Sequence, residues 1–65
     1  IMPLIKYKVN GRDKYAILVG KNGEPVNNLI LDKIGLPVMI KGQLKRMDNW
    51  DVVYFDVSKD IALVK

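Results

Sequence analysis

The segment Pro37–Val57 constrains the fold more than any other part of the chain, because its apolar residues recur with the period of a β-strand. Its first half alternates apolar and polar side chains from Val38 to Lys45, and its second half resumes this period from Val53 to Val57. The polar stretch Arg46–Asn49 between them predicts a tight turn. The segment therefore predicts a β-hairpin, with Gly42 at a bulge or bend in its first strand.

The N-terminal part of the chain predicts a second hairpin. Residues Leu4–Val9 alternate as a half-buried strand does, and Asn10-Gly11 is the strongest short signal for a hairpin turn, because both residues accept a positive φ. Lys14–Gly20 follows, apolar on both faces as in a central strand. Tyr7 and Tyr15 fall on the inward-facing series of these strands, so we interpret both as core residues.

Short elements complete the pattern. A second glycine turn at residues 21–24 leads into a brief strand at Glu24–Val26, which Pro25 restricts to an edge because proline has no N–H. After the hairpin of residues 37–57, Ser58–Asp60 predicts a turn and Ile61–Val64 a last short strand.

Residues Asn27–Ile34 predict a short helix. Asn27 or Asn28 can serve as the N-cap, and Gly35 stands where a helix C-cap adopts left-handed geometry. Pro37 prevents the helix from continuing. The alternative is a strand through residues 29–31, because a short apolar run does not distinguish the two.

This order of elements resembles that of the OB-fold, a small five-stranded Greek-key barrel with one helix between its third and fourth strands. The resemblance rests on element order, covers most of the chain and carries no family-specific motif. It implies a mainly β protein that binds ligands on the face of strands two and three, flanked by the loops that follow strands one and four. An SH3-like barrel is the alternative, since it explains the reversals but does not require the helix.

Composition limits the functions open to this chain. Its 65 residues predict a single domain over residues 1–65, near the lower size limit for independent folding. Cysteine and histidine are absent, which excludes disulfides, zinc sites and thiol or imidazole catalysis. Ser58 is the only serine, threonine is absent and the acidic residues are scattered singly. We therefore expect no enzyme, no cofactor and no metal site.

Origin and location are left open by the sequence. The chain begins at Ile1 rather than at a methionine, which fits either a processed product or a domain of a longer protein. The absence of cysteine fits the cytosol, the periplasm and the exterior equally. No apolar run approaches the ~18 residues of a membrane-spanning helix.

The charge is consistent with an anionic partner. The net charge of +4 comes from 11 basic and 7 acidic residues and attracts nucleic acid or anionic lipid. The same lysines also keep a small β domain soluble and protect its edge strands from aggregation. The charge alone therefore does not identify a partner.

The loops that the OB resemblance indicates contain side chains suited to single-stranded nucleic acid. They map to residues 10–14 and 46–51 and include both arginines and the only tryptophan. Basic groups bind phosphates, and an indole ring offers a base a stacking surface. The candidate nucleic-acid-binding residues are Arg12, Lys14, Lys41, Lys45, Arg46, Trp50 and Tyr54.

Each aromatic candidate also has a purely structural interpretation. Trp50 would cover the open end of the barrel over Leu44 or Met47, and Tyr54 would form an ordinary cross-strand pair with a lysine. Two functions thus stay open. The first is a non-enzymatic module that binds single-stranded or structured nucleic acid. The alternative is a protein-interaction or accessory domain of a larger protein, for which export is one option, with a homodimer as one form. Apolar residues on outward-facing positions favour this alternative: Leu4, Met39 and Val52.

Overall fold

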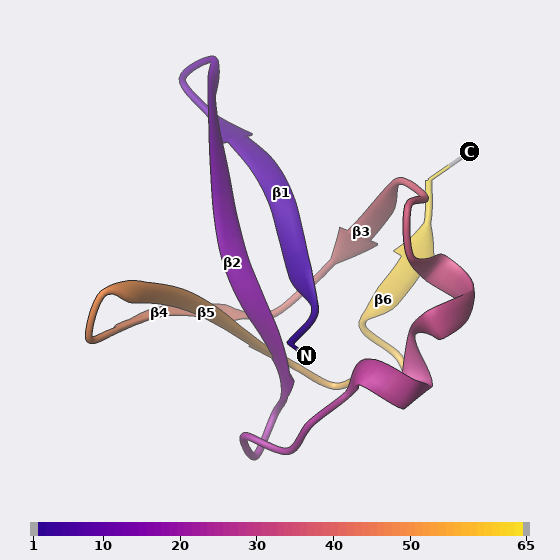
Figure 1. Ribbon diagram of the computed structural model, residues 1–65. Helices are drawn as coiled ribbons and strands as arrows, with labels where there is room; N and C mark the ends of the chain where they lie inside the picture. Colours follow the sequence, from indigo (N-terminus) through magenta and orange to yellow (C-terminus); the bar gives the residue numbers. More distant parts are fainter. Residues whose placement is uncertain (1, 65) are drawn as a thin grey trace.

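The structure is a computed structural model, and it describes residues 2–64 of the chain. Strands dominate it, and two short 3-10 helices, η1 and η2, lie between the second and third strands (Figure 1). In chain order the elements are β1 (Leu4–Val9), β2 (Arg12–Gly20), η1 (Asn27–Leu29), η2 (Leu31–Lys33), β3 (Val38–Ile40), β4 (Gln43–Met47), β5 (Trp50–Phe55) and β6 (Ile61–Leu63).

The larger sheet has the order β1-β2-β5-β4 and consists of two antiparallel hairpins. Asn10 and Gly11 close the first hairpin with φ values of 52° and 80°, as the predicted turn requires. Asp48, with φ 56°, lies in the turn of the second hairpin. Because both turns are tight, the strands extend further than predicted, and Arg12 and Arg46 lie in strands rather than in loops.

A parallel pairing of β2 with β5 joins the hairpins. Its register places Ile17 opposite Val52 and Gly20 opposite Phe55. The pairing does not reach the hairpin turns, and Figure 1 shows the two hairpins diverging from this common region.

β3 and β4 form one bent stretch of chain, in agreement with the bend predicted at Gly42. β3 pairs with β6 in a separate two-stranded sheet, β4 pairs with β5, and only Lys41 and Gly42 lie between β3 and β4. A Cβ atom at Gly42 would collide with the backbone oxygen of Tyr54 and lie 3.0 Å from the Cβ of Phe55. Glycine therefore allows the chain to change sheets directly against β5.

Residues 27–33 form two 3-10 turns instead of the continuous helix predicted over 27–34. The N-cap position is Val26, whose side chain has no acceptor, rather than one of the predicted asparagines. So short a segment gains little from helical hydrogen bonding, and Ile30, at φ −125°, interrupts it. Gly35 has the predicted left-handed φ, 79°.

The core lies between the larger sheet and the 3-10 segment. Leu18 and Phe55 of the sheet pack with Val26 and Ile30 in one buried cluster. Tyr15, predicted as a core residue, is 57% exposed instead. The main core cluster uses one face of the larger sheet, but Val52 on the opposite face, predicted at an outward-facing position, is also buried, with only 8% of its surface exposed.

The predicted mainly β architecture is confirmed, but the two sheets do not close into a barrel within residues 2–64. The described residues form six strands rather than five, because Gly42 divides one predicted strand into β3 and β4. Residues Glu24–Val26 are not a strand, since Pro25 lacks an N–H and Val26 packs into the core. The short last strand is confirmed as β6.

Candidate binding surfaces

The strand register assigns each side chain of the larger sheet to one of two faces. Paired residues place their side chains on the same face, and successive residues along a strand alternate. The inner face carries the core residues Leu18 and Phe55. The opposite face, called the outer face below, comprises Leu4, Lys6, Lys8, Asp13, Tyr15, Ile17, Val19, Gln43, Lys45, Met47, Trp50, Val52 and Tyr54.

Aromatic rings and lysines occur together on the outer face. Trp50 is 61% and Tyr15 57% exposed. The Nζ atom of Lys45 lies 5.3 Å from the centroid of the Tyr54 ring, within cation–π range. The main core cluster and the side chains packed against it contain no outer-face residue. This face therefore presents the exposed rings of Tyr15 and Trp50, the half-buried ring of Tyr54 and several ammonium groups, around the buried Val52.

Three of the seven residues predicted to bind nucleic acid share the outer face. These are Lys45, Trp50 and Tyr54. Arg12 and Lys14 do not join them, since they pair with Val9 and Tyr7 on the inner side of the first hairpin.

Arg46 and Lys41 also lie elsewhere. Arg46 pairs with Asp51 on the inner side of the second hairpin, and its Nη1 atom donates to Asp51 Oδ1 at 3.1 Å. Lys41 lies in the link between β3 and β4, where its backbone N–H donates to the carbonyl of Asp60. The single basic rim expected from the sequence is therefore not assembled.

The tight turns explain why the predicted binding residues are divided between the two faces of the sheet. With a two-residue turn at Asn10-Gly11, strand alternation begins at Arg12, and Arg12 and Lys14 share a face. The same alternation moves Tyr15 to the outer face, opposite Lys6 of β1. Sequence reasoning missed Tyr15 and Lys6 as surface partners, although the Asn-Gly turn was sufficient to derive their pairing.

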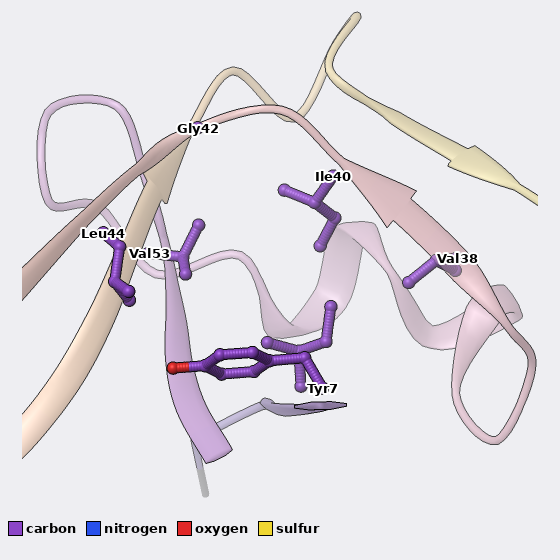
Figure 2. A pocket seen from close by; sticks show the side chains of 7 residues that line it. Tyr7, Val38, Ile40, Gly42, Leu44 and Val53 are labelled. Atoms are coloured by element: carbon purple, nitrogen blue, oxygen red, sulfur yellow. The ribbon is translucent and has the colours of Figure 1, made fainter. Parts of the chain in front are cut away.

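An apolar trough lies between β1 and β3, on the inner side of the larger sheet. Its first part, about 350 Å³, is lined by residues from β1, β3, β4 and β5. Figure 2 shows the ring of Tyr7 on one side of this space and Ile40 and Val38 of β3 on the other. Gly42 lies at the bend above it, with Leu44 beyond.

The trough continues into a larger part of about 790 Å³, beside the 3-10 segment. Both parts share Ile5 and Val38, so they form one continuous depression. Its lining is mostly apolar, and Lys6 and Lys33 are the only charged side chains in it among the described residues. The trough is thus suited to apolar groups, and of its two lysines Lys33 already lies 3.3 Å from Asp32 Oδ1.

One carboxylate is strongly perturbed, and its partners explain why. Ser58 donates to Asp56 Oδ1 from its Oγ at 2.6 Å and from its backbone N–H at 3.0 Å, and Lys21 lies 3.4 Å from Oδ2. These hydrogen bonds, those from Ser58 first, lower the pKa of Asp56 to about 2. The only serine of the chain thus stabilises the turn after β5.

The described residues show no other arrangement with evident chemistry. No group of three or more acidic, histidine or cysteine side chains among residues 2–64 could hold a metal ion. None of the helices in the described chain is long and apolar enough to cross a membrane. Comparison of the chain with protein-family models, curated protein sequences and solved structures finds no significant match.

Proposed function

We propose that this chain is a non-enzymatic binding module whose outer face binds single-stranded nucleic acid. The observation that carries the proposal is the placement of Tyr15, Trp50 and Tyr54 on one accessible sheet face, with lysines beside them. Bases stack on exposed rings, and ammonium groups contact the phosphates that follow the same path. The net charge of +4 supports the approach of such a ligand.

Three lysines of the outer face contact phosphates under this proposal: Lys6, Lys8 and Lys45. The Nζ atom of Lys8 lies 4.0 Å from Asp13, an exposed pair that salt screens. Lys45 already contacts the Tyr54 ring, so a base stacked there would have a cation beside its phosphate.

The OB-like architecture stays part of the proposal. β3 and β4 form one chain segment that bends from one sheet into the other, as strands do at barrel corners. The domain is then a small barrel that is open between β1 and β3. Nucleic acid binds its convex outer surface instead of the rim that element order implied.

The test measures fluorescence anisotropy of labelled single-stranded oligonucleotides. The slope of log affinity on log salt should be about −2, because three lysines are involved and each phosphate contact contributes ~0.7. Trp50→Ala should cost about 1–3 kcal/mol of binding free energy, the usual value for one stacked base. Quenching of the fluorescence of Trp50, the only tryptophan, should report stacking directly.

Neighbouring residues of β4 provide a matched control. Lys45→Ala should reduce the salt slope by about 0.7, whereas Arg46→Ala on the opposite face should leave it unchanged. Equal effects of both substitutions, or an affinity that Trp50→Ala does not alter, would contradict binding at the outer face.

A second candidate function, a protein-interaction domain, is favoured by a different observation. The trough lies mainly on the inner side, although Leu4 and Lys6 of the outer face also line its larger part.

A further inference from the structure

The folded chain exposes more surface than its mass requires. Its accessible area is 5233 Å² for a mass of 7.4 kDa. A monomeric protein of this mass exposes about 4200 Å². The difference, on the order of 1000 Å², is close to the ~800 Å² that each partner contributes to a standard protein–protein interface.

Part of this excess accessible area lies along the trough. Met2 is 66%, Ile34 66% and Leu36 49% exposed, and all three line it. Ile5 and Val38, which are only partly buried, form its middle. An apolar depression of this extent indicates an interaction site.

One wall of the trough offers unpaired backbone groups from β1. The Leu18 N–H donates to the carbonyl of Pro3 at 3.0 Å, which identifies the odd-numbered positions of β1 as those that bond to β2. The N–H and C=O groups of Leu4, Lys6 and Lys8 therefore point away from β2. β1 is an edge of the sheet, and no other described strand pairs with it.

The opposite wall of the trough offers unpaired backbone groups from β3. The Val64 N–H donates to the carbonyl of Pro37, and the Lys41 N–H donates to that of Asp60, at 3.0 and 2.9 Å. By alternation, the backbone groups of Val38 and Ile40 point away from β6. Figure 1 shows β6 on one side of β3 and β1 on the other.

We propose that the trough accepts an extended strand from a partner protein. The strand inserts between β1 and β3, pairs with both edges and completes a single sheet in the order β4-β5-β2-β1-partner-β3-β6. Its apolar side chains, at every second position, fill the trough. An acidic residue of the strand pairs with Lys6 or with Lys33, the charged side chains of the lining, and at Lys33 it competes with Asp32, whose Oδ1 lies 3.3 Å from the Lys33 Nζ.

A peptide strand can form hydrogen bonds with both edges of the trough and also fill its apolar lining, which other classes of ligand cannot do. Two edges with unpaired backbone groups require a ligand that donates and accepts at regular intervals, which an acyl chain cannot do. A phosphate backbone would leave its charges against an apolar lining. A strand satisfies both the edges and the lining, as in other cases of β-augmentation.

The experiment titrates the isotope-labelled chain with a synthetic peptide of about seven alternating valine and threonine residues that ends in glutamate. Amide exchange is followed by NMR. The N–H groups of Leu4, Lys6, Lys8, Val38 and Ile40 should become protected on binding. A control peptide of the same sequence, N-methylated at every second residue, keeps the side chains but cannot pair.

Substitutions at Lys6 test the backbone contact itself. Lys6→Pro removes an N–H that points into the trough edge and leaves the β1–β2 ladder intact, whereas Lys6→Ala removes the same side chain and keeps the N–H. Lys6→Pro should weaken peptide binding about tenfold relative to Lys6→Ala. Circular dichroism checks that the proline variant is folded, and the N-methylated peptide provides the same comparison on the unaltered chain.

Several results would overturn the proposal. One is the absence of binding at millimolar peptide. Another is equal binding of the N-methylated peptide, which would indicate simple adhesion to apolar surface. Sedimentation that shows a dimer protecting these same amides without peptide would assign the trough to a second copy instead. These results are distinguishable from a failure of nucleic-acid binding, because oligonucleotide affinity is measured separately. The two Lys6 variants both lack the lysine side chain of the outer face, so they are compared only with each other.

Discussion

Asp56 accepts hydrogen bonds that join distant parts of the chain. Ser58, two residues further on, donates twice to it, and Lys21, 35 residues earlier, donates to its other oxygen. The sequence predicted a turn over residues 58–60, and backbone bonds from Lys59 and Asp60 to the Asp56 carbonyl confirm one. The role of the Asp56 side chain was not predicted, because the approach of Lys21 depends on how β2 and β5 pair.

The lowered pKa of Asp56 predicts a loss of stability in acid. The value falls from 3.8 to about 2 on folding, so the carboxylate stabilises the folded state above about pH 4. This contribution is lost as the pH falls from about 4 to about 2. Urea denaturation at a series of pH values should show the loss, and Asp56→Asn should remove most of it.

Asp48→Asn is the matched control. Asp48 lies in a turn at φ 56°, a conformation that asparagine also accepts. This variant should keep the acid-dependent loss that the unaltered chain shows. If Asp56→Asn and the unaltered chain lose stability alike between pH 4 and pH 2, then Asp56 is not the group responsible.

At the scale of elements, the bend between β3 and β4 determines which strands meet. Gly42 lies against the backbone of Tyr54, which cannot move without disturbing β5. Gly20 is also crowded, but by the end of the Glu24 side chain, whose rotation would break only the hydrogen bond that its Oε1 accepts from the Asn22 N–H. A side chain added at Gly42 would therefore meet rigid main chain, whereas one added at Gly20 would meet a flexible side chain.

We predict that Gly42→Ala lowers the free energy of unfolding by about 2 kcal/mol, because the added methyl group overpacks against main chain. Gly20→Ala should lower it by about 1 kcal/mol, the usual value of the one hydrogen bond that is lost when Glu24 rotates. Urea denaturation monitored by Trp50 fluorescence measures both. Equal effects would mean that the collision at Gly42 is relieved as easily as the one at Gly20.

At the scale of the whole molecule, the chain buries too little surface to be strongly stable. An extended chain of 7.4 kDa exposes about 10,700 Å², so an accessible area of 5233 Å² means that folding buries about half. A domain of this size usually buries about 60%. The outer face and the trough contribute to this deficit, since both keep apolar side chains exposed.

We therefore predict a free energy of unfolding at or below about 5 kcal/mol, the lower end for folded domains. Saturation of the trough with the strand peptide should raise it by about 2.7 kcal/mol at a hundredfold excess over Kd. Thermal and urea unfolding, with and without peptide, provide the measurement. A stability near 10 kcal/mol without any ligand would show that the exposed apolar surface costs the chain little.

The sequence by itself determined the local structure. Its period of two predicted the strands, Asn10-Gly11 and Gly35 predicted turns with positive φ, and Gly42 predicted the bend. These features depend on the backbone preferences of single residues and on side-chain alternation, which do not require knowledge of the rest of the fold.

Only the tertiary structure decided which face of each strand is covered. Alternation shows that Tyr15 and Ala16 point in opposite directions, but it does not show which direction leads to the core. The parallel pairing of β2 with β5 and the packing of Val26 and Ile30 on the inner face settle that Ala16 is buried and Tyr15 exposed. Burial is a property of what packs against a surface, and so the two candidate surfaces could be identified only once the strands were assembled.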